Sequence, residues 1–530
     1  TESKNENPLA DPKIKLPSQY VFDVFRVSGG SEHAYGFHGC VDDGFDVNVK
    51  NKEAATGGFL QPFWPTRPST NLKGGAIGGW SIRQTPEFWS ADPDGNHLVA
   101  TWKLFPKADK RMSRGFAPVP GDKFTRLTLV NPEESRILHG IARSSGMDGY
   151  YGRCLYVVKG KWAEIPADPA KAVTPTGKDS VFVALIEPYA GGPSIVSQRQ
   201  LAIANNEQDA LRAVAVEVKT NNGHTDLLFA DGRSERVREI RNQQSVIRIA
   251  AEYAYVSRDA QGIRQATITG GKHLSMPGLL TLEVETARYE ATVTKVSYLN
   301  RVVTLKGEIP ERLAGHFFEV GNRFTKTADG FIDASGNNIH KTSYEVSKIK
   351  NKLFGKTELT LRKGIEIMRT RVRFADPKTG KVRGAISMMR HRGRDRGLVA
   401  SNDTITKLWR VTYTGGNRHR GHTFNLSPME PESEGPAFTA ADFPFGDGIR
   451  IWEFGPDDIF SIQTGVSIRR RGNGVYEVYA TSPFKLKLGS KIFKWSADGK
   501  SWKALSSQDG SVSITETQLP SSNTFLIKAE

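Results

Sequence analysis

Cysteine is almost missing from this chain of 530 residues, which contains only Cys40 and Cys154. Two cysteines in so long a chain exclude a scaffold built on disulfides, although the pair can still bridge in an oxidising compartment. Long apolar runs are missing as well, and none approaches the length that crosses a membrane. Helical periodicity is nearly absent too. The length itself provides ample core material, so we expect two to four globular domains.

Acidic residues are too few to balance the basic ones. The chain has 73 lysines and arginines against 57 aspartates and glutamates, a formal net charge of +16. A positive surface attracts polyanions such as nucleic acid, an anionic membrane or an acidic polysaccharide. The excess is spread along the chain, which argues against a basic tail and also fits an ordinary basic secreted protein. Nucleic acid is not favoured, because no aromatic residues interleave with the basic ones on a recognised scaffold.

What the chain has in abundance is strand patterning. Alternating apolar and polar residues recur along it, for example in residues 126–130, 180–186, 213–218 and 290–296. Turn signals separate these segments, among them Asp94-Gly95, Asn222-Gly223 and Asp231-Gly232. Many strands joined by short turns predict an all-β chain. We expect a large double-sheet β-sandwich of the supersandwich kind, followed by smaller β-sandwich domains.

Shifts in composition predict the domain boundaries. Residues 1–285 are expected to form the large sandwich, and residues 286–424 a second β domain. Residues 425–445 are acidic and rich in proline, which is typical of a linker. Strand patterns return in residues 446–530, whose size suits a small carboxy-terminal β-sandwich.

One early segment carries the side chains best suited to chemistry, His33, Tyr35 and His38. Imidazole and phenol groups can move a proton between carbon and oxygen. In a regular strand, His33 and Tyr35 share one face and His38 points to the other. A bulge at Gly36 or Gly39 would turn both histidines toward one site. The alternative is that these are surface histidines or histidines satisfied inside the fold.

The same segment carries a family resemblance. Residues 20–39 resemble the strand that opens the β-sandwich half of heparinase II/III-like polysaccharide lyases. The matching positions are Asp23, Phe25, Arg26, Val27, Gly29, Gly30, His33, Tyr35 and His38. A second stretch, residues 179–189, is similar to a strand and turn in the same half. The resemblance covers roughly residues 17–280.

The resemblance implies a lyase that cleaves an acidic, uronate-containing polysaccharide by β-elimination. In that reaction the uronate carboxylate is neutralised, a base removes the proton at C5, and an acid protonates the leaving oxygen at C4. The carbon acid is very weak until its carboxylate is shielded by a cation or by hydrogen-bond donors. His33, Tyr35 and His38 are the expected catalytic residues, with His33 favoured.

Two departures from the family pattern keep a second function open. The helical toroid, which in the family supplies a tyrosine acid/base and a group that neutralises the carboxylate, is absent from this chain. The spacing of His33 and His38 also differs from the His-x-His of many members. Either a helical amino-terminal partner segment completes the site, or the chain is a non-catalytic multi-sandwich protein that binds a polysaccharide or another protein.

A metal site is also implied by the resemblance, since relatives hold a structural zinc with two histidines and an aspartate. The candidates here are His33 or His38 with Asp42, Asp43 or Asp46, and a distant histidine such as His97 or His139; His38, Asp42 and Asp43 are favoured. Zinc or another divalent metal needs these ligands to converge in tetrahedral geometry.

Four further residues are expected to contact an anionic glycan: Arg26, Arg143, Arg153 and Trp89. Arginine pairs naturally with carboxylate or sulfate, and a sugar ring can stack on tryptophan. Solvated arginines and a core tryptophan are the alternatives, and both are common in all-β proteins. With the resemblance, an acidic polysaccharide as partner indicates a secreted or periplasmic protein.

Overall fold

The computed structural model describes residues 3–4, 17–29, 32–38, 42–54, 76–77, 80–82, 89–104, 122–144, 151–160, 179–242, 245–297, 302–321, 325–326, 332–333, 341–362, 368–375, 382–390, 397–399, 408–417, 421–428, 459–472, 474–489 and 492–530. These residues are mostly strand, with no α-helix and two short 3-10 turns, η3 (Glu311–Leu313) and η4 (Glu516–Gln518). The predicted all-β sandwich-type fold is confirmed. In this described part of the chain, no helix has the length and apolarity needed to cross a membrane.

The first sandwich contains most of the amino-terminal strands. Its five-stranded sheet has, in order, β3 (Val21–Ser28), β14 (Asp179–Ala190), β11 (Lys123–Leu129), β10 (Leu98–Leu104) and β5 (Asp42–Val47). The facing seven-stranded sheet contains β4 (Glu32–His38), β13 (Tyr151–Gly160), β12 (Ser135–Ser144), β8 (Trp80–Ile82) and β7 (Ala76–Ile77), with β9 (Trp89–Pro93) and β6 (Val49–Ala54) off the main path. Their facing side chains form one apolar core around Trp102 and Phe182.

The second sandwich is larger. Its ten-stranded sheet has, in order, β15 (Ile195–Gln200), β16 (Val214–Thr220), β17 (Thr225–Ala230), β20 (Tyr253–Asp259), β21 (Gly262–Thr269), β37 (Gly465–Gly472), β38 (Val475–Ala480), β44 (Thr524–Ala529), β40 (Phe493–Ser496) and β41 (Lys503–Leu505). The facing sheet has β18 (Arg238–Asn242), β19 (Ser245–Ala250), β22 (His273–Met276), β23 (Leu280–Val284), β39 (Phe484–Lys487), β43 (Ser511–Ile514) and β42 (Ser507–Gln508). A core rich in isoleucine, leucine and valine joins the two sheets.

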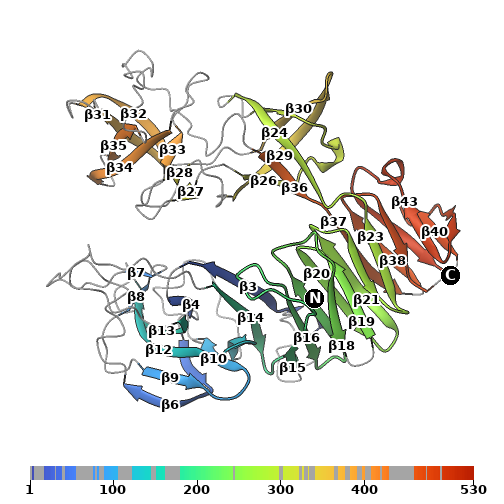
Figure 1. The fold of residues 1–530 in the computed structure, drawn as a ribbon, viewed down its shortest axis with the longest axis horizontal. Coiled ribbons are helices and arrows are strands. Elements are labelled where there is room, and N and C mark those ends of the chain that lie inside the picture. The colour runs from blue at the N-terminus through green and yellow to red at the C-terminus, as the bar shows by residue number, and fades with distance from the viewer. Residues whose placement is uncertain are drawn as a thin grey trace.

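The two sandwiches are stacked through strand β14, which is apolar on both faces. Phe182 and Ala184 face the core of the first sandwich. Val181 and Val183 face the other way and pack against Val214 and its neighbours on β16. Since successive residues of a strand point to opposite faces, this near-continuous apolar run is what a sheet covered on both sides requires. The result is four sheets in a stack, with the five-stranded sheet inside it (Figure 1).

A closed barrel is inserted into the chain between β23 and β37. It consists of β24 (Arg288–Ser297), β25 (Val302–Lys306), β30 (Lys356–Leu361), β29 (Lys341–Lys352), β26 (Phe317–Gly321) and β36 (Ile459–Gln463). Between β30 and β36 the chain forms a further sheet of β32 (Val382–Arg390), β31 (Met368–Ala375), β35 (Gly421–Pro428), β34 (Leu408–Asn417) and β33 (Gly397–Val399). Two small ribbons pair β1 (Ser3–Lys4) with β2 (Pro17–Ser18), and β27 (Thr325–Lys326) with β28 (Ile332–Asp333).

The sheets divide the chain differently from the predicted boundaries. Residues 1–285 contribute the whole first sandwich but only part of the second, which residues 465–529 complete. The described residues of 446–530 therefore form no separate sandwich, because β36 belongs to the barrel, β37 pairs with β21 and β39 pairs with β23. Of the predicted linker, 425–428 belong to β35 and 429–445 lie outside the described residues. Strand patterning locates strands but not their partners, which is why the completion of distant sheets was missed.

We expect the double-sided burial of β14 to be energetically critical. Replacing Phe182, which is fully buried, by alanine leaves a cavity against Phe25 and Tyr35. The free energy of unfolding should fall by about 3–5 kcal/mol. Chemical denaturation measures this loss, with Val196→Ala as the control. Val196 is 67% exposed on β15, so its change should stay within about 0.5 kcal/mol. Equal losses in both variants would contradict the burial of Phe182 in the core of the first sandwich.

Candidate functional site

His33 lies inside the fold rather than on a groove. It is 5% exposed on β4, the edge strand of the seven-stranded sheet, where it stands opposite Lys159. Its Nε2–H donates to the carbonyl oxygen of Gly29, which occupies the left-handed turn before the strand. Among the described residues its Nδ1 has no hydrogen-bond partner. The ring is therefore oriented by the turn that precedes its own strand.

Tyr35 is also directed into the first sandwich. Its ring stacks on Phe182 at 5.7 Å between centroids, and its Oη donates to Asp23 Oδ2 at 2.7 Å. Burial first, and then the hydrogen bond to Asp23, raise the pKa of Tyr35 far above its ordinary value. The phenol keeps its proton at neutral pH. Because Tyr35 and Asp23 belong to different sheets, the contact ties the two sheets together.

His38 is exposed on the opposite face of the same strand. Strand β4 pairs with β13 in unbroken register from Glu32 to His38, so the bulge considered from the sequence does not form there. His33 and His38 consequently point away from each other. Gly36 has a packing role instead, because a Cβ at that position would come within 2.9 Å of the Tyr156 ring.

The predicted metal ligands are only partly described. Asp42 and Asp43 belong to β5, in the sheet that faces β4, but their side chains lie outside the described residues. His97 lies in the turn after β9. Among the described side chains, no three histidines, cysteines, aspartates or glutamates gather as metal ligands. Zinc binding by His38 stays a prediction. Cys40 also falls outside the described residues, while Cys154 is buried with its Sγ 3.6 Å from the carbonyl oxygen of Gly140.

Arg26 makes hydrogen bonds within the protein. It leaves β3 on the side that faces the second sandwich. Its Nη1 donates to the carbonyl oxygens of Ala210 and Arg212 at 2.8 and 2.6 Å, and its Nη2 donates to that of Ala230 at 3.2 Å. Three carbonyl acceptors occupy most of the guanidinium donors. Arg26 therefore fastens the first sandwich to the loop between β15 and β16, rather than facing a ligand.

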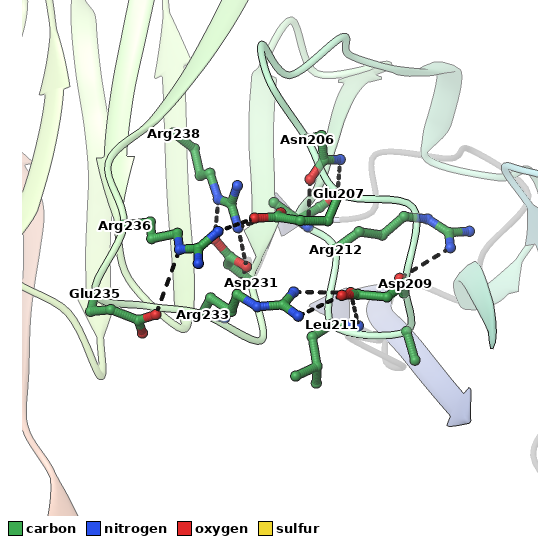
Figure 2. Close-up of polar contacts among 12 residues, drawn as sticks. Asn206, Glu207, Asp209, Leu211, Arg212, Asp231, Arg233, Glu235, Arg236 and Arg238 are labelled. Atoms are coloured by element: carbon green, nitrogen blue, oxygen red, sulfur yellow. Dashed lines mark hydrogen bonds and ion pairs between the residues drawn. The ribbon is translucent and has the colours of Figure 1, made fainter. Parts of the chain in front are cut away.

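That loop is itself held by a network of arginines and carboxylates, which Figure 2 shows. Arg238 donates to Asp231 at 2.6 Å and lies 2.8 Å from Glu207, while Arg233 forms a two-pronged pair with Asp209. The side chains of Arg238 and Asp231 are 4% and 0% exposed. A buried charge is tolerated only when it is paired and hydrogen bonded. These charges satisfy one another, so the network is structural.

Two predicted contact residues, Arg153 and Trp89, lie on either side of strand β12 in the first sandwich, near His139. Trp89 on β9 stands directly opposite His139 on β12. Arg153 on β13 opposes Ile141, two residues along the same face of β12 from His139. Lys52 reaches over from β6, with its Nζ 4.3 Å from the centroid of the Trp89 ring. We call Lys52, Trp89, Arg153 and His139 the cationic corner.

The pKa of His139 reflects the positive charge of the cationic corner. This imidazole is 4% exposed, and its Nε2 has no hydrogen-bond partner within the described part of the chain. Burial first, and then the positive charges of Lys52 and Arg153, lower its pKa from 6.5 to about 4. His139 is thus neutral at pH 7. The same positive potential that disfavours its protonation attracts an anion.

The sequence identified this corner only in part. Arg153 and Trp89 were selected by residue type, and His139 was named only as a distant metal ligand. Lys52 gave no signal, because a single lysine in a basic chain is unremarkable until a partner strand brings it over a tryptophan ring. Arg143 lies farther along β12, opposite Tyr151, and its side chain is outside the described residues.

No protein-family model matches this chain, and no curated protein matches it either. The likeness to heparinase II/III-like lyases therefore remains a hypothesis that rests on residues 20–39 and 179–189.

The depressed pKa of His139 predicts how stability depends on pH. In the unfolded chain an ordinary histidine takes up a proton near pH 6.5, whereas the folded protein resists protonation down to about pH 4. Between these values the unfolded state binds more protons, so the contribution is fully present above pH 6.5 and is lost as the pH falls. The loss should reach about 2–3 kcal/mol.

Equilibrium unfolding of the wild type and of His139→Gln between pH 4 and 7 tests this. The stability advantage of the wild type should shrink steadily as the pH decreases, because all other groups titrate alike in the two proteins. An advantage that stays constant over the whole range would show that His139 is not held neutral by its surroundings.

Proposed function

We propose that this chain binds an acidic, uronate-containing polysaccharide at the cationic corner. The single observation that carries the proposal is that Lys52 and Arg153 both lie near the unprotonated His139, with Lys52 over the ring of the neighbouring Trp89. Cations pair with the carboxylate or sulfate of such a polymer, and an indole ring offers a flat surface to a sugar ring. The formal net charge of +16 would further attract a polyanion over longer distances.

The reaction that we propose for the bound polymer is β-elimination, with this chain as the β-sandwich part of a lyase. Lys52 and Arg153 are suited to neutralise the uronate carboxylate, which makes the C5 proton more acidic. Removal of that proton forms the C4–C5 double bond and expels the oxygen at C4, which is protonated as it leaves. The predicted proton-transfer groups are His33, Tyr35 and His38, completed by a helical partner segment. A secreted or periplasmic location belongs to the same proposal.

Binding without cleavage is the second candidate, and a specific observation favours it. His33 and Tyr35 are 5% and 7% exposed, and both rings are hydrogen bonded within the first sandwich. His38 is exposed but lies on the other face of the seven-stranded sheet from Arg153. None of the three therefore faces the carboxylate-neutralising cations. A non-catalytic polysaccharide-binding protein needs only the cationic corner.

Affinity for acidic polysaccharides should depend on Lys52. Lys52→Ala removes the cation above Trp89 and should weaken binding to heparin, chondroitin sulfate or alginate roughly fivefold, about 1 kcal/mol. Retention on columns that carry each polymer measures the change. Lys500→Ala is the matched control, because Lys500 is an exposed lysine in the second sandwich. Equal losses in the two variants would mean that only overall charge matters and would refute a site at the corner.

Cleavage and binding can be separated with one assay. A lyase generates an unsaturated uronate that absorbs in the ultraviolet, whereas a binding protein is retained on the polymer and gives no such product. If cleavage occurs, His33→Ala should lower its rate by about a hundredfold or more while circular dichroism shows an intact fold. Full activity in that variant would remove His33 from the mechanism, and retention without product would establish the binding function alone.

A further inference from the structure

A cavity of about 280 Å³, open to solvent on one side, lies at the junction between the two sandwiches. It lies between the start of β3 and the outer face of the ten-stranded sheet, and is separate from the cationic corner. Its lining comes from the start of β3 and from β17, β20 and β21: Tyr20, Phe22, Leu228, Phe229, Tyr253, Ala254, Tyr255, Gln265, Thr267 and Thr269. The volume is close to the lower end of the roughly 300–1,000 Å³ typical of ligand pockets, which suits one small ring. We call it the junction cavity.

Aromatic side chains line the junction cavity from both sides. Tyr20 and Phe22 come from the first sandwich, while Tyr253 and Tyr255 come from the same face of β20 in the second. Tyr253 is 51% exposed, so it stands at the opening. Opposed aromatic rings provide flat apolar surfaces for the faces of a ligand ring, and tyrosine adds a hydroxyl at its edge.

Hydrogen-bonding side chains line a third side. Gln265, Thr267 and Thr269 alternate on β21, so all three lie on the face that carries Tyr253 and Tyr255. Thr267 shares a hydrogen bond of 2.8 Å with Ser467. The side chains of Gln265 and Thr269 make no hydrogen bond within the described residues. An amide and hydroxyl groups arranged in a row beside aromatic rings suit a ligand that has several hydroxyl groups.

A buried polar group lies behind the aromatic walls. Tyr20 Oη donates to Asp226 Oδ2 at 2.5 Å, and Asp226 is 1% exposed. Asp226 stands opposite Ser257 in the strand register. The Tyr255 hydroxyl interacts with both Asp226 and Ser257. This cluster of buried hydroxyl and carboxyl groups places further hydrogen-bonding groups next to the cavity.

The junction cavity differs in charge from the cationic corner. All ten lining residues are uncharged. Burial first, and then the negative charges of Glu252 and Glu319, raise the pKa of Tyr253, while Arg26 opposes them. Glu252 is itself paired with Arg288 at 3.3 Å, so charges of both signs surround the cavity and none of them lines it.

We infer that the junction cavity binds a neutral pyranose unit of an oligosaccharide, with the sugar ring between the tyrosines and its hydroxyl groups directed to Gln265, Thr267 and Thr269. The inference goes beyond the proposed function, because it assigns a second site with a different preference for charge. It uses no residue of the cationic corner.

Isothermal titration calorimetry with neutral oligosaccharides tests the site. The probes are gluco-, manno-, galacto- and xylo-oligosaccharides, and the comparison ligands are oligogalacturonates of equal length. At least one neutral probe should bind, and oligogalacturonates should not compete with it. Tyr253→Ala should weaken that binding roughly tenfold and Thr267→Val roughly fivefold. Both positions can be changed with little disturbance, since Tyr253 is half-exposed and valine has the shape of threonine.

The controls separate this site from the rest of the molecule. Tyr479→Ala removes an exposed tyrosine that lies on the same sheet but contacts His316 of the barrel, and it should leave binding unchanged. Lys52→Ala should also leave it unchanged, so that failure here and failure at the cationic corner are distinguishable. The inference is overturned if no neutral probe binds, if Tyr253→Ala binds as tightly as the wild type, or if oligogalacturonates occupy the site equally well.

Discussion

The double-sided burial of the five-stranded sheet is the constraint on which the rest of the structure depends. Val181 and Val183 pack against the second sandwich while Phe182 and Ala184 pack inside the first. A sheet with apolar residues on both faces has to be covered on both sides. The two sandwiches are thereby held against each other, and both the cationic corner and the junction cavity gain fixed walls.

Several side chains that are capable of acid–base or ligand-binding chemistry instead hold this stack together. Tyr35 and Asp23 join the two sheets of the first sandwich, and Arg26 joins the first sandwich to a loop of the second. Ion pairs of Arg238 with Asp231 and Glu207 hold this loop in place, so that its carbonyl groups can receive hydrogen bonds from Arg26. Residue type alone therefore does not distinguish a catalytic role from a structural one in residues 20–39, because histidine, tyrosine and arginine serve both.

The sequence predicts local structure well, but it does not predict which distant strands pair or which distant side chains come into contact. Alternation of apolar and polar residues predicts the strands, and Asp-Gly or Asn-Gly pairs predict the turns between them. Both signals depend only on residues that are close together in the chain. Whether β21 continues into β37, or whether Lys52 lies over Trp89, depends on contacts between distant segments that periodicity does not encode. For the same reason Arg153 and Trp89 could be selected by chemistry, whereas the burial of His33 could not be foreseen from a strand pattern that leaves open which face is covered.

Strands near the carboxy terminus complete sheets that were begun some 200 residues earlier, and this has a consequence for biosynthesis. Thr267 on β21 and its partner Ser467 on β37 are 200 positions apart, and the whole barrel lies between them. A nascent chain that has reached β23 has already made the strands that need β37 and β39 as neighbours, so two open sheet edges must wait while the intervening residues are translated. The barrel cannot close earlier either, because its last strand, β36, pairs with β24 and β26 and comes immediately before β37. Closure of the ten-stranded sheet is then the final event, and chaperones that shield exposed strand edges become most valuable during that interval.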